Sequence, residues 1–269
     1  MGDSLIKAVI LDWAGTSIDF GSMAPVKVFV ELFRERGIEL NNAEVREFMG
    51  MDKREHTRRL LHLEHIRMQW AENYGREPGE PDVESLFIKL EPKLAAIACK
   101  LSEPIHGAIE FVEDMHSLGV KVGTTTSYDA AMMKQIIPEA EKRGFKPDCI
   151  VNASDVPFGR PHPYMCYLNA IRMEVHPLNQ MVKIGDTVVD IQEGLNAGMW
   201  TIGLVKSGNE VGLSREELLN LGSEESKEIM NKAALKLKQA GAHYVAEGIW
   251  NCMPYIGIIE GRMRTGEKP

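Results

Sequence analysis

The sequence predicts an α/β protein in which a doubly wound parallel sheet carries an inserted, all-helical cap. Two patterns support this fold class. Short apolar runs, typical of buried parallel strands, alternate with amphipathic helical stretches along the second half of the chain. A long stretch between the first apolar run and the second shows only helical periodicity.

The core elements are expected in a regular strand and helix order. The first strand covers residues 7–11 and ends at Asp12 and a Gly-Thr turn. A helix over residues 108–118 ends before Gly119, which suits a helix C-cap, and leads into a strand over residues 120–126. The remaining core elements are a helix at about 129–143, a strand at 149–152, a helix opened by Pro161 and Pro163, a strand at 181–184, a helix at about 188–197, a strand at 200–205, helices at 216–221 and 224–239, a short strand at 244–245 and a last helix.

The stretch between the first two strands is too long for a simple crossover, which needs only about a dozen residues. We therefore assign residues 21–101 to the helical cap, and residues 1–20 and 102–269 to the core. The predicted breaks in the cap are an N-cap at Asn41-Asn42, a helix end at Gly50, a new helix near Lys53, and a Pro78-Gly79-Glu80-Pro81 turn before a last helix that begins at Asp82.

The composition argues against several classes of partner. The 269 residues carry a formal net charge of −8, which disfavours nucleic acid and anionic membranes and leaves small molecules as the expected ligands. No segment approaches the roughly 20 apolar residues needed to cross a bilayer. The first residues lack the basic flank of a signal peptide, and the four cysteines are scattered. We therefore expect a cytoplasmic protein with reduced thiols.

Asp12 and Lys53 together indicate an unusual reaction. In an open parallel sheet the site lies at the carboxyl ends of the strands, where Asp12 follows the first strand. An Asp nucleophile with a second Asp two positions later would describe a phosphate-ester hydrolase, in which the second Asp is the general acid, but here that position is Ala14. A lysine that forms a Schiff base with a carbonyl substrate offers another way for the leaving group to depart. This pattern predicts an aldehyde substrate that bears phosphorus.

Other side chains at the strand ends suit a phosphoryl group. A carboxylate that attacks phosphorus needs a divalent metal, a cation and hydrogen-bond donors to offset charge. Asp186 is the candidate metal ligand, Arg160 the cation, and Thr126 a hydroxyl donor. Hard carboxylate oxygens without a cluster of histidines favour Mg²⁺.

Six ordered segments resemble one known family. They are DWAGT at residues 12–16, MGxxK at 49–53, TTxY at 125–128, GRPxPxMCY at 159–167, GDTVxD at 185–190 and NAGMWT at 196–201. The order of motifs resembles the haloacid dehalogenase superfamily of aspartate-nucleophile phosphotransferases, which implies a Rossmann-like core. Within that superfamily, Ala14 and the cap lysine look like the phosphonoacetaldehyde hydrolase family.

The resemblance implies roles for the matching residues. Asp12 would be the nucleophile and a Mg²⁺ ligand, Lys53 would form the imine, and the protein ligands would be completed by the Ala14 carbonyl and Asp186. Thr126 and Arg160 would hold the phosphoryl group, with Asp190 behind the ligands. The residues expected to line the interface between cap and core are Met49, Gly50, His56 and Tyr128. Ser22 stands where a cysteine is expected, and Ser127 where glycine is more usual.

The implied reaction is hydrolysis of the C–P bond of phosphonoacetaldehyde to acetaldehyde and phosphate, in the degradation of 2-aminoethylphosphonate, by a homodimer. The C–P bond has no oxygen leaving group, so the imine at Lys53 would accept the bond electrons while Asp12 takes the phosphoryl group. Lys53 must be neutral to attack the aldehyde, which requires a pKa below the usual value of about 10.4.

Two other functions compete with this one. A Mg²⁺-dependent phosphatase or phosphomutase acting on small phosphate esters would share most of the motifs, although the absence of Asp at position 14 is adverse. A catalytically silent binding protein of the same fold is the third possibility. Such a protein would have little reason to retain Asp12, Thr126, Arg160 and Asp186 together.

Overall fold

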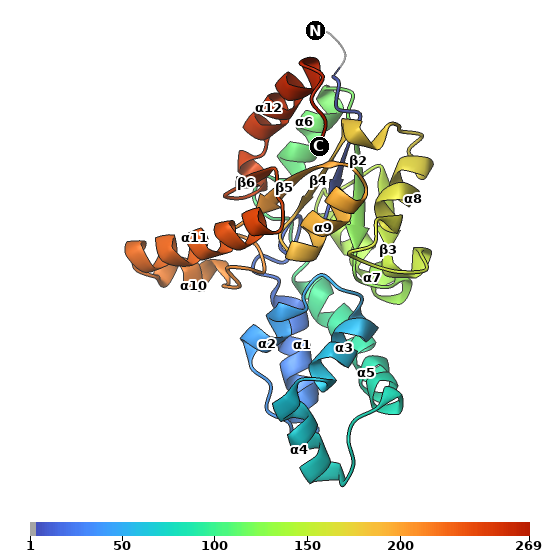
Figure 1. Ribbon diagram of the computed structural model, residues 1–269, viewed down its shortest axis with the longest axis vertical. Helices are drawn as coiled ribbons and strands as arrows, with labels where there is room; N and C mark the ends of the chain where they lie inside the picture. The colour runs from blue at the N-terminus through green and yellow to red at the C-terminus, as the bar shows by residue number, and fades with distance from the viewer. Residues whose placement is uncertain (1–3) are drawn as a thin grey trace.

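The computed structural model describes residues 4–269 and has a six-stranded parallel sheet at its centre (Figure 1). The strand order is β3-β2-β1-β4-β5-β6, and every neighbouring pair is parallel. The predicted α/β fold class is therefore confirmed. The strands are β1 Ala8–Leu11, β2 Lys121–Thr126, β3 Cys149–Asn152, β4 Met181–Gly185, β5 Trp200–Leu204 and β6 Tyr244–Ala246.

The strand order reverses at β1, which lies between β2 and β4. Leu11 of β1 pairs with Thr124 on one side and with Ile184 on the other. Ligands bind at such a switch point, in the crevice outside the carboxyl ends of the strands. The chain segments that follow β1, β2 and β4 therefore meet at one place.

Helices cover both faces of the sheet. Because successive side chains of a strand point to opposite faces, Val9 and Leu11 pack with α6 and α7, whereas Ala8 and Ile10 pack with α8. The core helices are α6 Ala108–Ser117, α7 Ala130–Lys142, α8 Tyr164–Arg172, α9 Val188–Asn196, α10 Arg215–Asn220, α11 Ser223–Gln239 and α12 Met253–Arg264, with 3-10 turns at Ala153–Asp155, Leu178–Gln180 and Ile249–Asn251.

Five helices between β1 and α6 form the cap, which lies beyond the carboxyl ends of the strands (Figure 1). The described stretch from residue 23 to residue 100 contains no strand. The interior of the cap is apolar and includes Phe29, Trp70 and Leu90, all of which are fully buried. The cap helices are α1 Met23–Arg34, α2 Asn42–Glu47, α3 Lys53–Leu61, α4 Glu64–Tyr74 and α5 Glu80–Lys100. The domain limits at residues 20/21 and 101/102 stay a prediction.

One predicted boundary is wrong by a short distance. The last cap helix was expected to begin at Asp82, but α5 begins at Glu80 and includes Pro81 in its first turn. Proline is tolerated there because the first backbone N–H groups of a helix have no partner within the helix. No helix within residues 4–269 combines the length and apolarity needed to span a membrane.

Candidate active site

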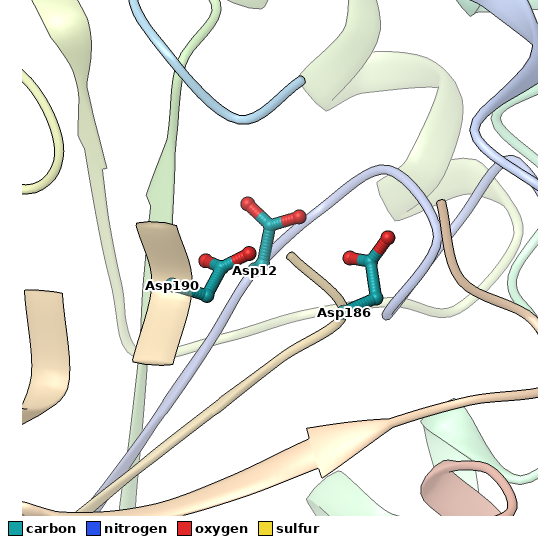
Figure 2. A group of neighbouring side chains, drawn as sticks. All are labelled: Asp12, Asp186 and Asp190. Atoms are coloured by element: carbon teal, nitrogen blue, oxygen red, sulfur yellow. The ribbon is translucent and has the colours of Figure 1, made fainter. Parts of the chain in front are cut away.

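Three carboxylates converge where the strand order reverses (Figure 2). Asp12 follows β1, Asp186 follows β4, and Asp190 lies in the first turn of α9. One carboxylate oxygen from each lies within 4.8 Å of the others, and all three side chains are buried. The site therefore concentrates negative charge where the topology predicts a ligand.

Arg160 joins these carboxylates from the loop that precedes α8. Its guanidinium lies 2.6 Å from Asp12 Oδ1, 3.1 Å from Asp190 Oδ1 and 2.9 Å from Glu193 Oε2. It also donates a hydrogen bond of 2.8 Å to the Thr125 carbonyl oxygen. These fixed bonds orient one oxygen of Asp12 toward Arg160.

Lys183 is a second buried cation, which the sequence reasoning missed. It lies on β4, and its Nζ is 2.9 Å from Asp190 Oδ1, 3.4 Å from Glu193 Oε2 and 2.9 Å from Thr125 Oγ1. The signal was available in the sequence. A lysine inside an apolar strand requires buried partners, and Glu193 lies one helical turn after Asp190.

The charges leave a place for a divalent cation. Four buried carboxylates face three buried cations; they are Asp12, Asp186, Asp190 and Glu193, against Arg160, Lys183 and, from the cap, Lys53. Burial raises the pKa of Asp186 well above its ordinary value, and the negative charges of Asp12 and Asp190 raise it further. A bound divalent cation would relieve this repulsion.

The polar partners distinguish Asp186 from Asp190. Arg160 and Lys183 both form ion pairs with Asp190 Oδ1, whereas within residues 4–269 Asp186 accepts hydrogen bonds only from neutral donors, among them Thr16 Oγ1 at 2.9 Å. The residues present therefore fit a Mg²⁺ site made by Asp12 and Asp186, with Asp190 behind it. No hydrogen bond to the Ala14 carbonyl oxygen is present among residues 4–269, so this oxygen is also available.

Lys53 reaches this edge of the sheet from the cap. It is the first residue of α3, whose N-cap Asp52 accepts hydrogen bonds from the backbone N–H groups of Arg54 and Glu55. Lys53 Nζ donates to Ser127 Oγ at 3.0 Å and lies 5.4 Å from the centre of the Tyr128 ring. Burial lowers the pKa of Lys53 to about 8, although nearby carboxylates partly oppose the shift.

The cap fits closely against the core next to Lys53. Gly50 has a φ of +86°, and a Cβ atom there would lie 2.5 Å from Val189 Cγ2 and 2.6 Å from Thr187 Oγ1. Only glycine allows this approach of the cap backbone to the start of α9. The cavity left between cap and core is about 10 Å³. With the cap in this position the cavity is too small for a phosphoryl group.

Most of the predicted site residues line this small cavity. Ser22 Oγ donates to Asp186 Oδ2 at 3.4 Å, and Thr126 Oγ1 accepts from the Tyr128 backbone N–H at 3.2 Å. The predicted residues that the structure brings together here are Asp12, Ala14, Ser22, Met49, Gly50, Lys53, Thr126, Tyr128 and Arg160.

His56 lies elsewhere. It is fully buried inside the cap, one helical turn after Lys53, and it does not line the cavity. Its Nε2 is 2.9 Å from the Val45 carbonyl oxygen, and its ring centre is 4.3 Å from that of Phe29. Burial holds the pKa of His56 well below its ordinary value, so the ring is neutral. The structure therefore gives His56 a packing position behind the lysine.

Comparisons with known proteins identify the family. A model of the haloacid dehalogenase-like hydrolases matches residues 6–198. The chain is 44% identical to the phosphonoacetaldehyde hydrolase of Nitratidesulfovibrio vulgaris, over 99% of this chain and 95% of that protein. It is 43% identical to the phosphonoacetaldehyde hydrolase of Bacillus cereus, over 90% of this chain and 92% of that protein.

The chain belongs to the phosphonoacetaldehyde hydrolase family. A solved structure of a phosphonoacetaldehyde hydrolase-like protein from Oleispira antarctica shares 40% identity with it and a TM-score of 0.96, covering all of this chain and 98% of that one. The predicted family is therefore confirmed, and so is membership among the haloacid dehalogenase-like hydrolases. Membership in this family therefore guides the interpretation of the site that contains Asp12 and Lys53.

The buried ion network predicts a large effect on stability. Lys183→Met would leave Asp190 and Glu193 sharing one cation, so we expect the free energy of unfolding to fall by about 3–5 kcal/mol. The matched control is Lys206→Met, which breaks a partly exposed pair with Glu247 and should cost less than about 1 kcal/mol. Urea unfolding of both variants measures the difference, and equal losses would contradict the assignment.

Proposed function

We propose that this enzyme hydrolyses the C–P bond of phosphonoacetaldehyde to acetaldehyde and phosphate. The observation that carries the proposal is the buried Lys53 amine, with a pKa lowered to about 8, at the edge of the sheet where Asp12 lies and position 14 carries no acid. Relatives that are more than 40% identical over nearly the whole chain are named phosphonoacetaldehyde hydrolases, which supports the same substrate.

The first step forms an imine at Lys53. The neutral amine attacks the aldehyde carbon, and loss of water gives a protonated C=N bond. The hydrogen bond to Ser127 Oγ fixes the position of Nζ beside Thr126, at the end of β2. Closure of the cap excludes bulk water from this step, since Lys53 is only 2% exposed.

The second step transfers the phosphoryl group to Asp12. Its carboxylate attacks phosphorus, the C–P bond breaks, and the bond electrons move into the protonated imine to give an enamine. Protonation of the enamine carbon and hydrolysis of the imine release acetaldehyde and restore Lys53. Water then hydrolyses the acyl phosphate on Asp12 to phosphate.

The surrounding residues hold the two reacting groups. Arg160 is bonded to Asp12 and offers further donors to phosphoryl oxygens, as does the Thr126 hydroxyl. Mg²⁺ bound by Asp12, Asp186 and the Ala14 carbonyl would offset the negative charge of the phosphoryl group. The proposed cavity walls are Met49, Gly50, Ser22 and Tyr128.

A phosphatase or phosphomutase acting on a small ester is the alternative. It would use the same Asp12, Arg160 and Asp186, but it would need an acid for the leaving alkoxide, and Ala14 supplies none. The deciding assay measures phosphate release from phosphonoacetaldehyde and from para-nitrophenyl phosphate. We expect turnover of the phosphonate only. Turnover of the ester alone would support the alternative, and turnover of neither would support a binding protein.

Two further properties belong to the proposal. A homodimer joined through the caps is what the resemblance to the phosphonoacetaldehyde hydrolase family implies, and the cap carries exposed large apolar side chains, among them Met68 and Ile88, which are 67% and 60% exposed. A cytoplasmic location is supported by the four cysteines, which form no disulfide among residues 4–269. A role in the degradation of 2-aminoethylphosphonate is what the resemblance to the phosphonoacetaldehyde hydrolase family implies.

The imine can be trapped chemically. Acetaldehyde or phosphonoacetaldehyde with borohydride should inactivate the enzyme by reducing an imine at Lys53, and peptide mapping should find the label there. Lys53→Arg should be nearly inactive, because a guanidinium stays protonated and forms no imine. Label at Lys183, or at no lysine, would show that the Schiff-base assignment is wrong.

The trapping rate should rise with pH around a midpoint near 8. An amine with a pKa of about 8 is about 10% neutral at pH 7, against about 0.03% for an ordinary lysine. Since only the neutral amine attacks, the rate should climb through this range and level off above it. Single-turnover trapping between pH 6 and 10 measures the profile. A midpoint above 10 would show that burial does not lower the pKa.

Phosphate release should require Mg²⁺, whereas imine formation should not. Asp186→Ala should lose phosphate release because the metal is no longer positioned, and Asp12→Ala because the nucleophile is gone. Both variants should still be labelled at Lys53 with acetaldehyde and borohydride. Undiminished phosphate release in excess chelator would refute the metal role.

A further inference from the structure

Arg46 on α2 of the cap binds the core at some distance from the reacting groups. Its guanidinium donates to the Gly21 carbonyl at 2.9 Å, to Asn209 Oδ1 at 3.2 Å and to the Gly212 carbonyl at 2.8 Å. Gly21 lies on the first linker between core and cap, whereas Asn209 and Gly212 lie on the core loop after β5. One cap side chain therefore binds two separate segments.

Asn209 connects this arginine to Asp186. The Asn209 side chain donates to the Arg46 carbonyl oxygen at 3.1 Å, so the two residues bind each other in both directions. The Asn209 backbone N–H donates to Asp186 Oδ2 at 2.8 Å. Asn209 is only 2% exposed. The same buried residue thus binds the cap and one oxygen of the proposed metal ligand.

The contact between Arg46 and the loop after β5 is closely packed. Gly212 has a φ of +65°, and a Cβ atom there would lie 2.5 Å from Arg46 Nε. The loop is also fixed at its start, where the Ser207 carbonyl accepts from the Gly21 N–H at 2.7 Å and Ser207 Oγ donates to the Gly15 carbonyl at 2.7 Å. The loop over residues 207–212 is therefore held from both the linker and the cap.

Opening of the cap must break part of this arrangement. The cavity of about 10 Å³ requires the cap to move for substrate to enter. Because Arg46 moves with α2 while Asn209 and Gly212 stay with the core, such a movement separates them. The side chain of Asn209 then loses its cap partners, although its backbone N–H remains next to Asp186.

We propose that Arg46 and Asn209 are positioning residues that couple closure of the cap to the Mg²⁺ affinity of Asp186. In the closed state Arg46 fixes Asn209, and Asn209 in turn holds Asp186 Oδ2 in one orientation. Linkage makes the effect reciprocal, so bound Mg²⁺ also favours the closed cap. The inference rests on the proposed metal role of Asp186, and it adds a route by which Arg46 acts on Asp186 without contacting it.

The test is a thermodynamic cycle in Mg²⁺ affinity. Calorimetric titration of the substrate-free protein would compare wild type, Arg46→Ala, Asn209→Ala and the double variant. Each single variant should raise the Mg²⁺ dissociation constant at least about fivefold. Asn209→Ala keeps the backbone bond to Asp186, so its effect must come through the cap. The double variant should lose no more Mg²⁺ affinity than the single variant with the larger loss, because both substitutions break the same link between the cap and Asp186. Additive losses would overturn the proposal.

The matched control is Arg67→Ala, which removes a cap arginine whose partner Glu77 also lies in the cap. Its Mg²⁺ dissociation constant should equal that of wild type. Small-angle scattering in chelator should give a larger radius of gyration for Arg46→Ala than for Arg67→Ala. If Arg46→Ala binds Mg²⁺ as tightly as wild type, the residue is merely structural and the inference is wrong.

A milder variant keeps the test decisive if Arg46→Ala does not fold. Arg46→Lys retains the charge but cannot reach three acceptors with one planar group, so it should weaken Mg²⁺ binding by a smaller factor. Unchanged affinity in Arg46→Lys and Asn209→Ala would again overturn the inference. If wild type binds no Mg²⁺, this inference and the metal assignment fail together, whereas failure of borohydride trapping removes only the Lys53 mechanism.

Discussion

Burial of Lys53 at the contact between cap and core is the feature on which the proposed chemistry depends. Lys53 Nζ of α3 donates to Ser127 Oγ, directly after β2, at 3.0 Å. The same contact buries the amine and lowers its pKa to about 8. Since desolvation causes the shift, the amine has this reactivity only while the cap covers it. In the proposed mechanism the amine is therefore reactive while the cap covers it, and it becomes an ordinary lysine when the cap opens.

The core, in contrast, stabilises buried charges by ion pairing. Arg160 and Lys183 form ion pairs with Asp190 and Glu193, and Arg160 also binds Asp12, the proposed nucleophile. Paired charges of this kind are costly to bury, so they are tolerated where the fold provides several partners for each ion. Within residues 4–269 Asp186 forms no ion pair, which agrees with its proposed role as a metal ligand.

The sequence predicted the parts of this site that depend on motif and topology. Asp12, Arg160 and Asp186 converge because parallel strands bring their carboxyl ends together, and the alternating pattern predicted those strands. The partner of Lys53 could not be predicted in the same way. The contact with Ser127 depends on how the cap sits on the core, and neither residue carries information about the other in the local sequence.

The position of His56 shows a second limit of the sequence. Its spacing from Lys53 is compatible with a cavity position and with a place inside the cap, and packing against Phe29 decides between them. Lys183 was missed for a different reason. Its charge inside an apolar strand was visible, but its partners Asp190 and Glu193 become evident only when α9 is placed against β4.

The proposed mechanism uses the imine at Lys53 in place of the acid that is absent at position 14. Its most direct test is phosphate release from phosphonoacetaldehyde and from a phosphate ester, for wild type and Ala14→Asp. An enamine passes its electrons to the lysine nitrogen and gains nothing from a carboxylic acid at position 14, whereas an alkoxide does gain. We expect Ala14→Asp to cleave the phosphonate no faster than wild type and to hydrolyse the ester slightly faster. Several-fold faster cleavage of the phosphonate by Ala14→Asp would show that proton delivery limits the native reaction and would contradict this mechanism.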